Sequence, residues 1–336
     1  MIMNIFLVLI FTILVIIVLA LIFVGFKLVQ MYLGKKKLLK QQSTVRIKKI
    51  EPLGTVKQLK IMPLVDYYSD QENLQTEAGV SYLLQADGKT ILFDCGYNKA
   101  QRHPSPLLHN MQELGYKMED LDLIYISHLH CDHVGGDREE KEGTFSISQG
   151  VIDLPEIPVY SPVELKPSSW NPGPKVRVME EPFLIDQGIA SIGVIPRYLF
   201  LLGLTLEQSL AINVAGKGIV LVIGCGHQGM ESIIERTKLL FDQPIYGIVG
   251  GLHYPVKGGR MDIGPFNMQQ IVATDDPPWC GMNEERVHQA LTTIKDTGAK
   301  KISLSAHDSS DWCLELFRKT LGDRYIPLKA GTEIII

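Results

Sequence analysis

Three histidines and one aspartate fall within six positions of this chain, in the stretch SHLHCDHVGG from Ser127 to Gly136. The preceding residues, 121–126, are mostly apolar and include β-branched side chains, a pattern that predicts a buried strand. The two glycines that close the stretch predict a tight turn. The four donor side chains are therefore expected where a strand ends and the chain turns, a frequent position for catalytic and binding residues.

The spacing within this stretch indicates a metal centre. His128 and His130 are two positions apart, so on an extended segment both side chains point the same way. Asp132 and His133 follow where the chain starts to turn, and they can face a second point nearby. Imidazole and carboxylate ligands suit Zn²⁺, Mn²⁺ and iron. Two ligand pairs on one turn favour two ions that hold a hydroxide between them, whereas a structural role would leave four buried polar groups in need of partners.

Further ligands must come from other segments, and three histidines have suitable positions. Each follows an apolar, strand-like run and precedes a polar or glycine-rich turn: His227, His253 and His307. The remaining histidines have polar or amphipathic surroundings and are expected at the surface: His103, His109 and His288.

Turn signals divide the rest of the chain into short elements. Asp87-Gly88 separates two β-like runs and 215–218 separates another pair, so both predict hairpins. Helical patterns follow at about 230–241, 283–297 and 311–321. This order predicts two β-rich halves with helices outside them.

The motif and its neighbours resemble the metallo-β-lactamase superfamily. SHLHCDHVGG is similar to that superfamily's metal-binding signature, and ILFDCG (91–96) is similar to its strand and Asp-containing turn. Downstream, VLVIGCGHQG, GIVGGLH, the histidine after ISLSA and Ile195-Pro196-Arg197 resemble one subgroup of metal-dependent hydrolases. Members of that subgroup are often labelled dihydropterin ribofuranosyl-aminobenzene phosphate synthases. The similarity covers roughly residues 59–336 and leaves the N-terminal segment outside.

The resemblance implies an α/β fold with an αββα sandwich and a centre with two divalent ions. The apolar N-terminal segment, which lies outside the resemblance, is expected to add one transmembrane helix before the sandwich. Zn²⁺ is favoured, with Mn²⁺ and iron as alternatives. The resemblance implies three ligands for each ion: His128, His130 and His227 for the first, and Asp132, His133 and His307 for the second. It also implies that Asp94 orients a ligand histidine. Where the superfamily often has a bridging Asp, this chain has Cys225, which either bridges as a thiolate or packs. The superfamily's separate His-containing loop is missing.

Several residues near these ligands have two interpretations each. His253 acts on substrate as an acid or phosphate contact, or it braces a ligand from behind. Arg197 is a candidate anion contact or a surface ion-pair partner. Asp308 orients His307 or caps the following helix. The loop 254–282 is long for a compact domain and is expected to be a lid or a disordered insertion.

The N-terminal segment is uncharged and apolar, unlike the rest of the chain. No charged residue occurs from Met1 to Phe26, and about 20 apolar residues suffice to cross a bilayer. A cleaved signal peptide would need a basic start and a shorter apolar run. A lysine cluster follows, so the positive-inside rule predicts a single-pass membrane protein with its catalytic domain in the cytoplasm. We expect an anchor at 1–30, a basic juxtamembrane linker at 31–55 and a metallo-β-lactamase-like domain at 56–336.

The charge and cysteine content of the chain argue against two classes of protein. The net charge is −4 and the basic residues form no stripe beyond the linker, so nucleic-acid binding is not expected. The five cysteines are odd in number and lack CxxC spacing, which argues against a disulfide framework.

We expect a membrane-anchored, metal-dependent hydrolase in which Asp132 and His253 are catalytic and a metal-bound hydroxide attacks an ester, lactone or phosphoester. The expected partners are the membrane and a small-molecule substrate, for which an anionic or phosphorylated compound is favoured. The alternatives are a di-metal redox enzyme of the same fold and a membrane-tethered sensor without turnover.

Overall fold

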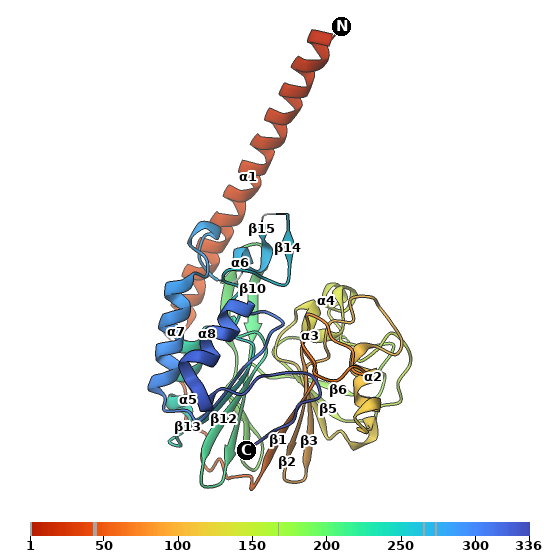
Figure 1. Ribbon diagram of the computed structural model, residues 1–336, viewed down its shortest axis with the longest axis vertical. Helices are drawn as coiled ribbons and strands as arrows, with labels where there is room; N and C mark the ends of the chain where they lie inside the picture. Colours follow the sequence, from red (N-terminus) through yellow and green to blue (C-terminus); the bar gives the residue numbers. More distant parts are fainter. Residues whose placement is uncertain (1, 43–45, 167, 265, 273) are drawn as a thin grey trace.

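Two β-sheets pack face to face, and helices cover the outer side of each sheet (Figure 1). The computed structural model describes residues 2–42, 46–166, 168–264, 266–272 and 274–336. One long N-terminal helix, α1 (Ile2–Gln42), projects from the domain.

The first sheet has seven strands in the order β17-β1-β2-β3-β4-β5-β6. The hairpin predicted at Asp87-Gly88 is confirmed, because it joins the antiparallel strands β2 and β3. From β3 to β6 the neighbouring strands are parallel. The strands are β1 (Leu59–Val65), β2 (Ser81–Ala86), β3 (Lys89–Phe93), β4 (Leu123–Tyr125), β5 (Pro158–Ser161), β6 (Lys175–Val178) and β17 (Ile334–Ile335).

The second sheet has six strands in the order β16-β13-β12-β11-β8-β7. The hairpin predicted around 215–218 is also confirmed and joins β11 to β12. β12, β13 and β16 run parallel. The strands are β7 (Phe183–Asp186), β8 (Ile189–Ser191), β11 (Leu210–Val214), β12 (Gly218–Ile223), β13 (Ile245–Gly250) and β16 (Lys301–Leu304). Two separate hairpins consist of β9 (Ile195–Leu199) with β10 (Gly203–Glu207), and β14 (Asp262–Ile263) with β15 (Phe266–Asn267).

The apolar side chains form three layers that explain this arrangement. Ile61, Ile91 and Val222 belong to the layer between the two sheets. Ile233 of α5 and Leu291 of α7 belong to the layer outside the second sheet, and a third layer lies beneath α2. The αββα sandwich expected from the sequence is therefore confirmed. The helices are α2 (Pro106–Glu113), α3 (Cys131–Val134), α4 (Asp137–Glu142), α5 (Met230–Leu240), α6 (Met268–Val272), α7 (Glu284–Asp296) and α8 (Asp311–Leu321), with short 3-10 turns at Met118–Asp120, Pro278–Cys280 and Gly322–Arg324.

Helix α1 is long and apolar enough to cross a membrane, and its second half docks on the domain. Gly34 lies against the ring of Tyr198 in β9, Met31 is buried, and the Lys27 ammonium donates to the Leu201 carbonyl. The helix continues past residue 30, so the segment predicted as a linker begins as docked helix. The boundaries at 30 and 55 stay predictions.

Replacing Gly34 with leucine is expected to push α1 off the β9–β10 hairpin, because a Cβ at this position would collide with the Tyr198 ring. Overpacking of this kind costs about 1–3 kcal/mol, so the melting temperature of the full chain in detergent should fall by roughly 2–10 °C. Gly25→Leu is the matched control, since a Cβ there meets nothing within 4 Å. Equal melting temperatures for the two variants would contradict the docking.

Candidate metal centre

The motif that opens the site is shaped by its glycine turn. His128 and His130 lie on the extended segment between β4 and α3, while Asp132 and His133 lie within α3. Gly135 ends α3 with a φ of 95°, and a Cβ there would collide with the Ser146 carbonyl. Because only glycine fits this position without strain, the turn fixes how α3 presents its side chains.

The structure brings all six predicted ligands together. They follow β4 of one sheet and β12 and β16 of the other, at the carboxyl ends of parallel strands, the edge where α/β sheets bind ligands. The ring centroid of His227 lies 5.3 Å from that of His128 and 4.9 Å from that of His130. The rings of His133 and His307 are 5.4 Å apart.

Cys225 lies at the centre of this cluster. Its Sγ is 3.1 Å from His133 Nε2 and 3.2 Å from His307 Nε2. Donor atoms of Asp132, His133, Cys225 and His307 all lie within 4.8 Å of one another, as do those of His128, Cys225 and His227. The thiol is therefore common to the donor groups that contain predicted ligands of both ions.

His227 carries the most direct sign that a ligand belongs here. The side chain is buried, yet neither Nδ1 nor Nε2 has a hydrogen-bond partner among the described residues. Buried polar atoms are almost always paired, and leaving them unpaired costs free energy. A metal ion would satisfy one of these nitrogens, so the donor set fits the predicted centre.

His253 approaches the same cluster from β13. Its ring centroid is 4.6 Å from that of His227, and its φ of 54° is unusual for a residue with a side chain. The Asp308 carboxylate accepts its backbone N–H at 2.9 Å. Ser310 caps α8, so the capping alternative for Asp308 is wrong. Donor atoms of Cys225, His253 and Asp308 form a third close group, which the sequence did not suggest.

Carboxylates hold the ligand residues from behind. Asp94 accepts the backbone N–H and the hydroxyl of Ser127, each at 2.7 Å, and lies 2.7 Å from His133 Nδ1. Two further carboxylates were not predicted. Asp66 contacts the Ser305 hydroxyl, which lies 2.6 Å from His307 Nδ1. Glu207 accepts the backbone N–H groups of Cys225 and Gly226 at 3.1 and 2.8 Å.

Asp66 had the same sequence signal as Asp94, an apolar strand ending in Asp, in the run LKIMPLVD. Glu207 lies at the end of β10 without such a signal. Burial dominates both groups and raises the pKa of each to about 7, although their hydrogen-bond donors oppose that shift.

Burial keeps most of the imidazoles neutral, which is the form that binds metals. Desolvation, followed by repulsion from neighbouring histidines, lowers the pKa of His128, His227 and His307 well below the usual value. The pKa of His130 falls to about 3 and that of His253 to about 4, again chiefly through burial. His133 is different: burial opposes its charge, but the carboxylates of Asp132 and Asp94 outweigh it and raise the pKa to about 9.

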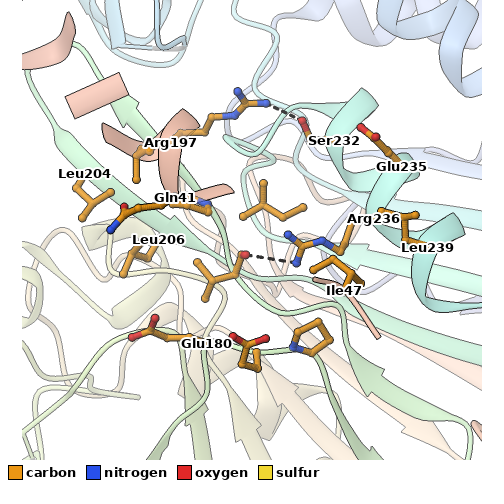
Figure 2. Close-up of a pocket in the computed structure, with 16 residues that line it drawn as sticks. Gln41, Ile47, Glu180, Arg197, Leu204, Leu206, Ser232, Glu235, Arg236 and Leu239 are labelled. Carbon is orange, nitrogen blue, oxygen red and sulfur yellow. Dashed lines mark hydrogen bonds between the residues drawn. The ribbon is translucent and has the colours of Figure 1, made fainter. Parts of the chain in front are cut away.

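A polar pocket of about 390 Å³ opens beside His227 and His253, and Arg197 and Arg286 also line it. Arg197 donates to the Gln228 carbonyl at 2.9 and 2.6 Å and to the Ser232 hydroxyl at 2.7 Å. Figure 2 shows it reaching Ser232 at the edge of a second pocket, which Leu38 and Gln41 of α1 also line. Arg197 therefore secures the turn that follows His227, and it borders two pockets.

The loop 254–282 has structural elements of its own in its described part. They are the β14–β15 hairpin, α6 and a 3-10 turn at Pro278–Cys280. Gln269 of α6 is buried, and its carbonyl lies 3.3 Å from His253 Nε2. The loop thus contacts a residue of the cluster directly, as the lid interpretation requires.

Comparison with known proteins yields one family match and several relatives. Residues 72–145 match the family "Anti-Pycsar protein Apyc1". The chain is 24% identical over 329 residues to the 7,8-dihydropterin-6-methyl-4-(β-D-ribofuranosyl)-aminobenzene-5′-phosphate synthase of Methanocaldococcus jannaschii, covering 84% of this chain and 98% of that protein. A shorter match, 43% over 54 residues, is to Anti-Pycsar protein Apyc1 of Saccharibacillus brassicae, covering 16% of this chain and 19% of that one.

Solved structures identify the architecture. The structure of Tm1679, a metal-dependent hydrolase of the β-lactamase superfamily, matches with a TM-score of 0.55 at 17% identity. The match covers 82% of this chain and 98% of Tm1679. At that level of identity, the likeness concerns the fold.

Proposed function

Because the chain has the metallo-β-lactamase fold, we propose that it is a metal-dependent hydrolase with a binuclear centre at the meeting edge of its two sheets. The observation that carries the proposal is the buried cluster around His227, whose imidazole has no hydrogen-bond partner among the described residues and lies beside other neutral imidazoles and a thiol. Such a set is costly to bury unless it binds ions.

The proposed ligands are the six that the motif and the resemblance predict. One ion would be held by His128, His130 and His227, and the other by Asp132, His133 and His307. Two divalent ions, with Zn²⁺ favoured, would polarise a carbonyl or phosphoryl oxygen and lower the pKa of water toward about 7. Asp94 and Ser305 would keep the rings of His133 and His307 in place, as carboxylates and hydroxyls behind metal ligands do.

Asp132 and His253 are the proposed catalytic residues. Asp132 is only partly buried, so its second oxygen can orient the attacking water as well as hold an ion. His253 borders the pocket of about 390 Å³, and its Nδ1 lacks a hydrogen-bond partner among the described residues. It would contact the leaving group or a phosphate oxygen on the substrate side.

Cys225 is proposed to supply a sulfur ligand to both ions, because its Sγ belongs to the donor groups of both sites. This position favours the bridging interpretation of Cys225 over the packing interpretation. With cobalt in place of the native ions, the protein should show a thiolate-to-cobalt charge-transfer absorption that Cys225→Ser removes. Cys131→Ser is the matched control, because Cys131 lies in the motif but in none of the close donor groups. An absorption unchanged in Cys225→Ser would restore the packing interpretation.

We also propose that α1 anchors the protein in a membrane with its domain in the cytoplasm, and that 1–30, 31–55 and 56–336 are its functional divisions. The support is the charge-free start and the lysines that follow it. Protease added outside sealed cells should leave the domain intact and degrade it only after permeabilisation. Degradation in intact cells would reverse the orientation.

The hydrolase proposal is tested on the full chain in lipid nanodiscs. Close to two metal ions per chain are expected, together with hydrolysis of an ester, a lactone or an aryl phosphodiester that stops on chelation and returns with Zn²⁺ or Mn²⁺. One ion or fewer after remetallation would exclude the binuclear centre. Bound iron with dioxygen uptake and no hydrolysis would favour the redox alternative.

A further inference from the structure

An apolar groove lies between α1 and the segment 275–279, outside the metal centre. Its volume is about 630 Å³, and its apolar lining comes from Leu28, Met31, Tyr32, Leu39, Pro277 and Trp279. Met31 is only 5% exposed, whereas Tyr32 and Trp279 are 66% and 70% exposed. The groove is within the size range of small-molecule sites, roughly 300–1,000 Å³.

Its position along α1 places the membrane-side end of the groove at the level of lipid head groups. The charge-free run ends at Phe26, and a helix rises about 1.5 Å per residue. Leu28 therefore lies about 3 Å beyond the run and Leu39 about 20 Å beyond it, while the polar layer on each side of a bilayer is roughly 5–8 Å deep. Tyr and Trp are the residues typical of that layer, and Lys35 and Lys36 also line the groove.

The groove and the polar pocket beside the metal centre share one wall. Asp275 and Asp276 line both spaces. On that wall, Lys35 of α1 lies 3.2 Å from Asp275 and 3.3 Å from Asp276. Arg197 lies 3.5 Å from Asp275, and Arg286 lies 2.6 Å from Asp276. Three cations against two carboxylates leave this wall with one net positive charge.

The orientation of the domain agrees with this placement. α3, α6 and the β14–β15 hairpin lie at the end of the sandwich from which α1 projects, whereas the C-terminus lies at the opposite end (Figure 1). With α1 in a bilayer, the metal-centre edge would face the lipid surface.

We propose that the groove binds the acyl chain of a membrane lipid, and that the centre acts on anionic amphiphiles whose head group reaches past the Asp275–Asp276 wall. The inference rests on the proposed membrane anchor for the placement of the groove and on the proposed hydrolase function for the catalytic step. A protein partner fits less well, because the groove begins where α1 would leave the lipid.

Binding is tested by photocrosslinking, which needs no turnover. The full chain is placed in phosphatidylcholine nanodiscs that contain a phosphatidylcholine with a diazirine in one acyl chain, and adducts are mapped by mass spectrometry. Adducts are expected on 275–279 as well as on 5–26. Met31→Trp should fill the groove and remove the adducts on 275–279 while those on 5–26 persist.

Leu33→Trp is the matched control, because Leu33 is 57% exposed on the same helix and lies outside the groove lining. It should keep both sets of adducts. Equal metal content and melting temperature in the two variants would show that each remains folded. Adducts confined to 5–26 in the parent, or unchanged on 275–279 in Met31→Trp, would overturn the proposal.

The substrate class is tested with aryl phosphodiesters of increasing alkyl length. Each methylene buried in the groove should lower KM by roughly fourfold in the parent. In Met31→Trp this dependence of KM on alkyl length should flatten, whereas in Leu33→Trp it should persist. Adducts on 275–279 without any hydrolysis would support lipid binding in the groove and contradict the hydrolase proposal. Hydrolysis without adducts on 275–279 would support the hydrolase proposal and contradict lipid binding in the groove.

Discussion

His227→Ala is expected to lose about one of the two bound metal ions and most of the turnover. The substitution removes one of the three histidines proposed for this ion, and His128, His130 and the shared Cys225 sulfur would hold it much more weakly than the complete set. A bound ion contributes several kcal/mol of transition-state stabilisation, so kcat should fall by roughly a hundredfold or more. Metal content and kcat are measured on the same preparation.

His253→Ala is the informative partner of that experiment. Both residues follow strands of the second sheet, and their rings lie 4.6 Å apart. His253 lines the polar pocket and contacts the loop that covers it, so this variant should retain both ions and lose about 10²–10⁴-fold in rate. If His253→Ala instead lost the ion and His227→Ala kept it, the close group of Cys225, His253 and Asp308 would contain the true ligand, and the two roles would be exchanged.

Asp94→Ala should destabilise the fold and the centre together. Asp94 is fully buried and faces three groups, the Ser127 N–H, the Ser127 hydroxyl and His133 Nδ1. Each buried group left unpaired costs about 1–3 kcal/mol, so the three together should cost roughly 3–9 kcal/mol and lower the melting temperature by about 6 °C or more. Loss of the group that orients a ligand histidine should weaken metal binding by about 10–100-fold.

Two further variants separate stability from metal binding. Asp122→Ala is the matched control, because Asp122 also accepts a backbone N–H, that of Thr90 at 2.8 Å, but lies partly exposed. It should change stability by about 1 kcal/mol and leave the metals in place. Asp94→Asn keeps the shape and one acceptor oxygen, so it should fold better than Asp94→Ala yet still bind metal weakly. Full metal affinity in Asp94→Asn would mean that Asp94 serves the fold alone.

The sequence predicted the parts of this protein that depend on local pattern. Hairpins at Asp87-Gly88 and before β12 follow from turn chemistry, and the motif residues follow from spacing on a strand end. Asp66 carried the same signal as Asp94 and was overlooked, because its link to His307 runs through Ser305, far along the chain. Glu207 and the central place of Cys225 depend on how distant strand ends meet, which no local pattern contains.

The docking of the second half of α1 is a further feature that local sequence pattern does not predict. Its lysines look like the flank of a membrane span, and they predicted a linker. Such a segment docks only if a small residue in it can pack against a side chain that is distant in sequence, as Gly34 packs against the ring of Tyr198. That contact is set by the position of β9 in the finished fold.

The docked helix also makes the protein mechanically stiff. If α1 crosses a bilayer, the apolar run and the part seated on the domain belong to one unbroken helix with no hinge between them. The 25 charge-free residues of this helix, from Ile2 to Phe26, exceed what a hydrocarbon core of about 30 Å requires, and a helix that is too long tilts. The domain must tilt with it, so bilayer thickness would set the angle at which the catalytic edge meets the surface. Comparing turnover in nanodiscs of short-chain and long-chain lipids would reveal an enzyme that responds to membrane thickness.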